Sequence, residues 1–357
     1  IPMRLILAAH VHQPLGNFDF VFERLTAESY RPFFQVLKRH PGARWAFHAS
    51  GCLFEWWENH DPKMIDLIGE LAGAKSLEFL LGGFYEPILA AIAHEDRLGQ
   101  IKMMRDYLAK TFGVEARGLW MTERVWEPSL TVDLAEAGVR FVLLDDHHFF
   151  SSGRRAEDLF RYYLTEAEDK SVAVFPMDKT LRYLIPFKPL SEIEKYLRTL
   201  AAQGREVAVY ADDGEKFGGW PGTKAWVFDE GWLENFFSAL ERWNQDFLTT
   251  STFAEIMETA PPAGLVYLPT TSYPEMGEWS GGTWKNFFVK YPESNWMNKT
   301  VAWLGRELRR PKRRATPEAL GHLWSAQCND AYWHGVFGGL YLPHLRREIW
   351  RHIAWLK

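Results

Sequence analysis

The chain has 357 residues, of which 47% are hydrophobic and 24% charged, and its formal net charge is −5 at pH 7. This length suits one large domain with an insertion or two modest domains, and the net negative charge argues against binding to nucleic acid. Two cysteines, Cys52 and Cys328, are too few for a disulfide framework and fit a reducing compartment. The apolar run at residues 5–9 is too short for a signal peptide or a membrane span, so we expect a cytoplasmic protein with no membrane partner.

Apolar runs of strand length alternate with helical patterns along most of the chain. Strands are predicted at residues 4–9, 45–48, 77–81, 119–121, 141–144, 172–175, 206–210 and 265–268. Helices are predicted at residues 22–39, 64–71, 97–112, 130–137, 193–200, 224–239, 298–310, 317–325 and 345–355. This alternation predicts an α/β fold in which parallel strands pair through right-handed crossovers.

Acidic or histidine side chains follow the same end of strand after strand. They are His10 and His12, Glu86, Glu123, Asp145 and Asp146, and Asp213. A closed barrel gathers the carboxyl ends of its strands around one mouth, whereas an open sheet spreads them along an edge. No Gly-x-Gly-x-x-Gly sequence follows the first strand, so the dinucleotide-binding fingerprint is absent. We therefore predict a barrel.

Glu123 is the strongest candidate for a catalytic residue, because a short buried strand, residues 119–121, delivers it into an aromatic and cationic setting. An apolar wall would raise the pKa of its carboxyl group, and the neighbouring Arg124 would lower it. The alternative is a surface pair of Glu123 with Arg124, but adjacent strand residues point to opposite faces. Asp213 at another strand end would complete a glycosidase-type pair of carboxylates. The stretch after it, residues 214–218, could instead be a tight turn with a solvated Glu215–Lys216 pair.

His10 and His12 allow two interpretations. Two histidines at i and i+2 after a first strand are similar to the metal sites of barrel amidohydrolases, which need further histidines and a late aspartate. The later strands supply Glu and Asp instead, so we expect no metal and predict that both histidines bind substrate hydroxyls. One of them could also be a satisfied core histidine. Glu78 alternates within a predicted strand, so it faces either the barrel lumen or the helices, and an acid in the lumen is costly unless it binds something.

Five stretches together carry a family resemblance. They are residues 10–14 (HVHQP), 77–87 (LEFLLGGFYEP), 119–128 (LWMTERVWEP), 211–223 (ADDGEKFGGWPGT) and 326–341 (AQCNDAYWHGVFGGLY). The chain resembles glycoside hydrolase family 57, and within it the branch of 4-α-glucanotransferases and α-amylases. The stretches span nearly the whole chain in the family's order, so the signal is specific.

The resemblance implies a distorted (β/α)7 TIM-like barrel, residues 1–280, followed by a helical region, residues 281–357, that completes the active-site cleft. It also implies a retaining mechanism on α-1,4-glucans or maltooligosaccharides, with no cofactor. By the family's pattern Glu123 matches the nucleophile and Asp213 the acid/base. His10, His12, Glu78, Trp120, Trp220 and Asp330 match positions that line the sugar site.

Two features of the chain differ from the pattern of that branch. Members of the branch usually carry a longer segment between the residues equivalent to 278–280 and 282–284. Larger members also continue into a β-rich domain after the helical region. The shorter segment leaves the choice of acceptor open, because the same pair of carboxylates serves a 4-α-glucanotransferase and an α-amylase. Two remoter alternatives are a metal-dependent hydrolase that uses His10 and His12, and a sugar-binding module without turnover. The sequence gives no indication of oligomeric state.

Overall fold

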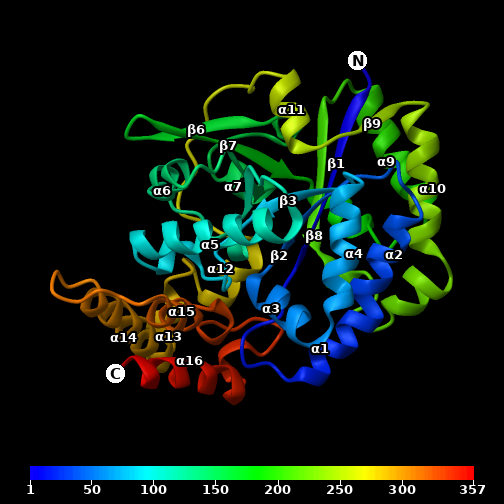
Figure 1. Ribbon diagram of the computed structural model, residues 1–357. Coiled ribbons are helices and arrows are strands. Elements are labelled where there is room, and N and C mark those ends of the chain that lie inside the picture. Colours follow the sequence, from blue (N-terminus) through cyan, green and yellow to red (C-terminus); the bar gives the residue numbers. More distant parts are fainter.

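The structure, a computed structural model, describes residues 1–357. Its centre is a barrel of seven parallel strands in the order β7-β5-β4-β3-β2-β1-β8 (Figure 1). Their bounds are β1 Met3–Val11, β2 Trp45–Ala49, β3 Leu77–Leu81, β4 Gly118–Trp120, β5 Phe141–Asp145, β7 Lys170–Met177 and β8 Val207–Asp213. The amide of Asp178, directly after β7, donates to the carbonyl of Val209 in β8 at 2.8 Å and closes the ring. The predicted fold class is confirmed.

Helices cover the outside of the barrel and follow the strands in turn. In the first half they are α1 Asp19–Leu25, α2 Arg31–Lys38, α3 Gly51–His60, α4 Pro62–Gly73, α5 His94–Phe112, α6 Leu130–Glu136 and α7 Asp146–Phe150. Then come α8 Lys179–Leu184, α9 Leu190–Ala202, α10 Trp232–Asn244 and α11 Phe253–Thr259. A π-helical turn, Thr26–Tyr30, joins α1 to α2, so the single helix predicted at residues 22–39 is one continuous helical stretch.

Two short strands lie outside the ring of seven, and one predicted strand is wrong. β6, Tyr163–Ala167, pairs antiparallel with β7, and β9, Leu248–Thr250, pairs parallel with β1. Residues 265–268, predicted as a strand, form only a single bridge, between Leu265 and Leu164 of β6. Leu265 and Tyr267 are exposed there, because the segment runs along the outer edge of β6 instead of entering the barrel.

Two main apolar clusters make up the core, and a third of six residues includes Tyr273 and Trp284. Small side chains such as Ala8 and Ala46 and large ones such as Trp120 fill the barrel lumen together, and Phe253 and Ile256 of α11 join them. Helix α11 lies beside the amino ends of the strands (Figure 1) and so plugs that end of the barrel. The larger cluster packs the strands against the helices and contains most of the fully buried tryptophans. Core packing therefore accounts for much of the tryptophan content.

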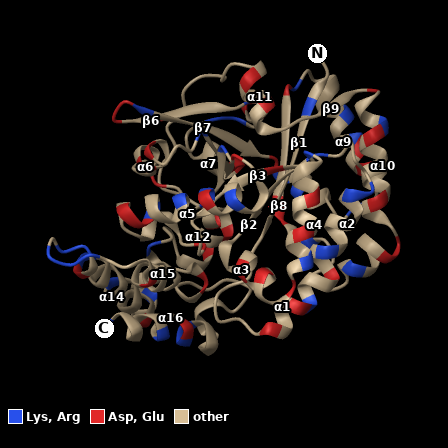
Figure 2. Cartoon of the chain, viewed as in Figure 1, with Lys and Arg blue, Asp and Glu red and all other residues tan.

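The last quarter of the chain is helical and lies beside the carboxyl ends of the strands (Figure 1). Its helices are α12 Pro274–Ser280, α13 Asn286–Lys290, α14 Pro292–Leu308, α15 Pro317–Ser325 and α16 Pro343–Leu356. The basic run at residues 312–314 is an exposed turn between α14 and α15, visible as a blue loop remote from the barrel in Figure 2. None of the helices combines the length and the apolar character needed to cross a membrane.

Candidate active site

Strand alternation explains how the barrel mouth acquires its polar side chains. Along a strand, residues i and i+2 share a face. Ala8, Ala46 and Ala211 lie in the lumen, and two residues further along the same faces come His10, His48 and Asp213. The strand register pairs His10 with His48 on one side and with Asp213 on the other. The apolar lumen therefore ends in a layer of polar side chains.

Glu123 lies just beyond β4 in a turn that twists its backbone into the left-handed region, with φ 52°. The hydroxyl of Tyr273 donates to its Oε2 at 2.6 Å, and the hydroxyl of Ser272 donates to its carbonyl at 2.6 Å. A pair of backbone hydrogen bonds between Trp126 and Thr271 brings this second segment against the turn. A left-handed glutamate costs free energy, so the surrounding contacts must hold it in place.

Burial raises the pKa of the Glu123 carboxyl group to about 7, although Arg124 and the Tyr273 hydroxyl both favour the ionised form and Asp213 opposes it. Arg124 is held beside this carboxylate by an ion pair of its Nε with Oδ1 of Asp145, 3.1 Å apart, and by the ring of Tyr273, whose centroid is 4.4 Å from its Cζ. Glu123 thus has a cation and a hydrogen-bond donor that stabilise its negative charge.

Asp213 is buried in the same way. Burial and the neighbouring carboxylate of Asp212 raise its pKa, although Arg124, Lys216 and Arg182 favour its ionised form. Asp212 is the ionised member of the two, because Arg182 and Lys216 overcome its burial and lower its pKa. The two adjacent aspartates are therefore distinct: ion pairs lower the pKa of Asp212, whereas the pKa of Asp213 is raised.

His12 joins the barrel to the helical region. Its Nδ1 lies 2.7 Å from the Ser50 hydroxyl and its Nε2 lies 2.6 Å from Oδ1 of Asp330. Burial alone would lower the pKa of His12, but Asp330 raises it well above the usual value. The backbone amide and side-chain amide of Asn329 both donate to the carbonyl of Glu86, at 3.1 and 2.8 Å, which fixes the position of Asp330.

His10 stacks on Trp120 with ring centroids 4.7 Å apart and an angle of 6° between the rings. Its Nδ1 is 2.7 Å from Nδ1 of His48, and burial lowers the pKa of both rings, that of His48 to about 3. On the other side of this pair lies Glu86, whose burial raises its pKa to about 8. The floor of the mouth is thus a neutral aromatic and imidazole surface at pH 7.

Trp220 lies at the rim, half-buried. Its ring centroid is 5.1 Å from Nζ of Lys216 and 6.3 Å from the ring of Phe337 in the helical region. Lys216 itself pairs with Asp212, and Oε1 of Glu215 accepts from the Tyr30 hydroxyl at 2.7 Å and the His12 amide at 3.0 Å. The interpretation of residues 214–218 as a turn with a solvated Glu215–Lys216 pair is therefore wrong.

Glu78 is not brought together with the other predicted site residues. It faces the lumen one layer below His48, level with Ala46. Its two carboxylate oxygens accept from the amides of Phe253 and Ala254, at 2.8 and 3.0 Å, in the first turn of α11. The prediction that a lumenal acid must bind something holds, but its ligand is a helix N-terminus, and the role of Glu78 in a sugar site is not supported by this geometry.

The metal-hydrolase alternative needs His10 and His12 in one ligand set, and the structure separates them. His10 falls with His48 and Glu86, whereas His12 falls with Cys328 and Asp330. In the first group the two Nδ1 atoms face each other, so the Nε2 atoms face separate oxygens of Glu86, at 3.8 and 3.9 Å. His10 and His48 thus form a hydrogen-bonded pair of imidazole rings above the carboxyl group of Glu86. No group of possible metal ligands contains both His10 and His12.

Sequence reasoning missed several members of the site. His48 could have been found, because it ends a predicted strand two residues after the lumenal Ala46. Tyr273 could not, because it comes from an irregular segment about 150 residues after Glu123. Glu86 follows a predicted strand, but the sequence alone does not indicate its role. Its left-handed backbone, φ 55°, cannot be recognised from the neighbouring residues.

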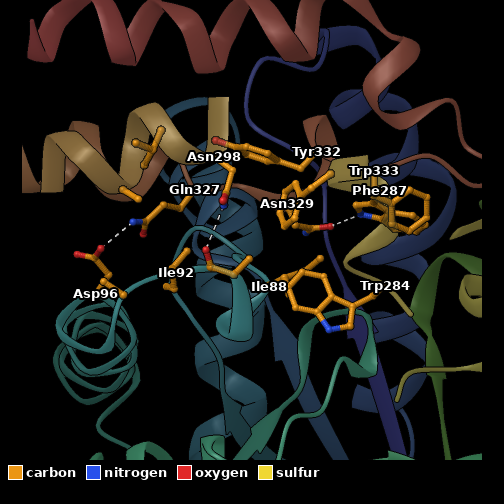
Figure 3. Close-up of a pocket in the computed structure, with 15 residues that line it drawn as sticks. Ile88, Ile92, Asp96, Trp284, Phe287, Asn298, Gln327, Asn329, Tyr332 and Trp333 are labelled. Atoms are coloured by element: carbon orange, nitrogen blue, oxygen red, sulfur yellow. Dashed lines mark hydrogen bonds between the residues drawn. The ribbon is translucent and has the colours of Figure 1, made fainter. Parts of the chain in front are cut away.

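An apolar pocket beside Asn329 is lined by neither Glu123 nor Asp213 (Figure 3). Ile88 and Ile92 of the barrel face Trp284, Phe287 and Tyr332 of the helical region across it. Most of its polar lining is hydrogen-bonded within the protein: Asn298 donates to the Ala91 carbonyl at 3.1 Å, Gln327 to Asp96 at 2.8 Å and Trp333 to Asn329 at 2.7 Å. The pocket lies in the interface between the barrel and the helical region, which we call the seam.

These features define an α/β-barrel protein with two buried carboxyl groups, Glu123 and Asp213, at an aromatic mouth. The chain belongs to glycosyl hydrolase family 57, whose profile matches residues 6–269. Residues 282–357 match the profile described as the middle domain of alpha-amylase/4-alpha-glucanotransferase.

Relatives with two different names match about equally well. The 4-alpha-glucanotransferase of Thermococcus litoralis is 46% identical over 98% of this chain and 57% of its own length. The alpha-amylase of Pyrococcus horikoshii is 45% identical over 98% of this chain and 59% of its own length. The chain thus spans less than two thirds of these relatives.

Among solved structures, the 4-alpha-glucanotransferase from Thermococcus litoralis superposes with a TM-score of 0.95 at 45% identity, over 99% of this chain and 59% of that one. A branching enzyme of the same family from Pyrococcus horikoshii has a TM-score of 0.74 at 15% identity, over 98% of this chain and 88% of that one, which is a likeness of fold.

Proposed function

We propose that the protein is a retaining enzyme acting on α-glucans, and specifically a 4-α-glucanotransferase that transfers α-1,4-glucan segments. One observation carries the proposal: two buried carboxyl groups with raised pKa values share the barrel mouth, and of the two only Glu123 accepts a hydrogen bond from a side-chain hydroxyl, which favours its ionised form. A glycosidase needs such a division of roles. The domain division, a catalytic barrel at 1–280 and a helical region at 281–357, and the cytoplasmic location belong to the same proposal, the latter because both thiols are free.

In the first half of the reaction Glu123 attacks the anomeric carbon, and Asp213 gives its proton to the departing glycosidic oxygen. Tyr273 and Arg124 support the carboxylate before attack, since both favour its ionised form. In the second half Asp213, now ionised, removes a proton from the acceptor hydroxyl, and the acceptor displaces Glu123. Two displacements at one carbon return it to the α configuration.

The remaining side chains of the mouth bind the sugar. His10, His12 and Asp330 offer hydrogen-bonding groups, and Trp220 offers aromatic surface at the rim. Trp120 is buried against His10, so its part in the sugar site is to position that ring. Glu78 is left out of this set because both its oxygens are taken by α11.

The first test is Glu123→Gln, which keeps the volume of the side chain but cannot form a glycosyl ester. We expect kcat on maltooligosaccharides to fall by about 10⁴-fold or more with an unchanged thermal melt. Glu136→Gln, on the exposed face of α6, is the matched control and should retain wild-type rates. Proton NMR of the wild-type reaction should detect the α-anomer as the first product. A β-anomer, or an active Glu123→Gln variant, would overturn the proposed mechanism.

The alternative function is an α-amylase, in which water takes the place of the acceptor sugar. The relatives named alpha-amylase, 45% identical, favour it about as much as those named 4-alpha-glucanotransferase favour transfer. Because the catalytic pair is shared, only the fate of the glycosyl intermediate separates the two.

A further inference from the structure

We propose that His12, Cys328 and Asp330 form a binding site for a soft divalent cation such as Zn²⁺ or Cd²⁺. One ligand atom of each residue lies within 4.8 Å of the others. Oδ1 of Asp330 is the meeting point: Nε2 of His12 lies 2.6 Å from it, and the thiol of Cys328 donates to it at 3.6 Å. Thiolate, imidazole and carboxylate are the three ligand types of protein zinc sites, and the thiolate favours soft cations over Mg²⁺ or Ca²⁺.

The three side chains are held ready by their neighbours. Ser50 engages Nδ1 of His12 at 2.7 Å, which orients the ring so that Nε2 faces the cluster, as outer partners of metal-binding histidines do. Cys328 and Asp330 flank Asn329, which is anchored twice to the carbonyl of Glu86. Contacts from both the barrel and the helical region therefore hold the three side chains in position at the seam.

A cation can reach the cluster from the mouth. The side chains of His12 and Asp330 are 12% and 24% exposed, while Cys328 is buried beneath them. Three protein ligands leave a fourth position for water, as in open zinc sites. On binding, the metal takes the place of the thiol proton and of any proton on Nε2 of His12, and these protons leave to solvent.

The two other groups of potential ligands lack this combination. Neither contains a thiol. In the group of His94, Asp133 and Glu136, the guanidinium of Arg97 lies 2.5 Å from Asp133 and competes with a cation. No Lys or Arg is paired with Asp330. His12, Cys328 and Asp330 are thus the set best suited to a soft metal.

Occupation of the site should inhibit the enzyme, because it removes His12 and Asp330 from the sugar site. This consequence rests on the proposed function, whereas binding itself does not. The metal would be an inhibitor and not a catalytic ion, which agrees with a reaction carried by Glu123 and Asp213 alone.

Titration of the purified protein with Cd²⁺ tests the binding directly, through the ultraviolet charge-transfer band of a cadmium–thiolate bond. We expect one equivalent per chain, with affinity reduced at least tenfold and the band lost in Cys328→Ser. Cys52→Ser is the matched control: its thiol contacts Cys328 but is outside the ligand set, so the band should remain. Thermal melts verify that both variants are folded. No band in the wild type, or loss of the band in Cys52→Ser alone, would overturn the site.

Inhibition is measured separately. Zn²⁺ should lower wild-type activity on maltotriose, a chelator should restore it, and Cys328→Ser should be at least tenfold less sensitive. A cadmium band without any glucan activity would refute the proposed function and leave the metal site standing. Equal inhibition of wild type and Cys328→Ser would refute the inhibitory role of the site.

Discussion

At the scale of single residues, the contact between Tyr273 and Glu123 affects the pH at which the proposed nucleophile becomes ionised. Burial raises the pKa of Glu123 to about 7, and the Tyr273 hydrogen bond of 2.6 Å works against that rise. Attack requires the ionised form, so activity is present above this pKa and is lost as the pH falls through it. The acidic limb of kcat/KM, which reports the free enzyme, should therefore lie near neutrality.

Tyr273→Phe should move this acidic limb to higher pH. Without the hydroxyl the carboxylate loses one charge-assisted hydrogen bond, so its pKa rises, by about one pH unit for a bond of ordinary strength. At a pH below the limb, kcat/KM should fall by roughly tenfold relative to wild type, with a much smaller loss on the high-pH plateau. The pH profile of kcat/KM on a maltooligosaccharide checks this.

Tyr267→Phe is the control for that experiment, since its hydroxyl is exposed and bonded only to Glu166. Its profile should coincide with the wild-type one. A uniform loss of rate in Tyr273→Phe with no displacement of the limb would mean that Tyr273 merely packs against Glu123.

At the scale of elements, the sequence predicted what depends on local pattern. Apolar runs and alternation located all seven barrel strands, and strand ends located His10, Glu123 and Asp213. Tyr273 was missed because it reaches Glu123 through the bridge of Thr271 with Trp126, a pairing between distant irregular segments. The strand at 265–268 was wrongly predicted because an apolar run at a sheet edge has the same composition as one inside a barrel.

Glu78 illustrates the same limit, because its family position suggested sugar binding while its contacts indicate a cap on α11. Glu78→Ala should leave two amides of the first helical turn without acceptors and so lower the free energy of unfolding by about 2 kcal/mol. Denaturant unfolding monitors the loss, and kcat/KM at a temperature where the variant is folded should stay near wild type. Unchanged stability together with a large fall in kcat/KM would return Glu78 to the sugar site.

At the scale of the whole molecule, the barrel and the helical region share one mouth, and its aromatic side chains differ in availability. Trp284 and Tyr332 are buried in the seam. Trp279 and Trp333 are half-buried and stacked with centroids 6.1 Å apart, and Trp279 lies 6.1 Å from Tyr273, the partner of Glu123. These two tryptophans extend an aromatic surface outward from the nucleophile.

The junction that follows Trp279 is a compact turn. Gly281 ends α12 with a left-handed backbone, φ 79°, and Asn286 donates to its carbonyl at 3.3 Å. Lys290 also donates to the carbonyl of Trp279, at 2.8 Å. In the proposed mechanism water can also react with the glycosyl intermediate, so an acceptor sugar must be bound in order to compete with it.

Competition with water at roughly 55 M is feasible for a held acceptor, because positioning can give effective molarities of about 10⁵ M or more. A sugar stacked on Trp279 and Trp333 also excludes water from the carbon it will attack. We therefore expect transfer to exceed hydrolysis. Maltotriose should yield glucose and a ladder of longer maltooligosaccharides, with little gain in total reducing ends.

Trp279→Ala should change this partition without changing the chemistry of the first step. Loss of one stacking surface, worth about 1 kcal/mol, should lower the ratio of transfer to hydrolysis by roughly fivefold while glucose release from maltotriose continues. Trp296→Ala, an exposed position on α14, is the control and should keep the wild-type ratio. Product chromatography with a reducing-end assay measures both quantities. If the wild type itself produces reducing ends steadily and nothing longer than maltotriose, the intermediate goes to water, and the protein is an α-amylase with the same Glu123 and Asp213.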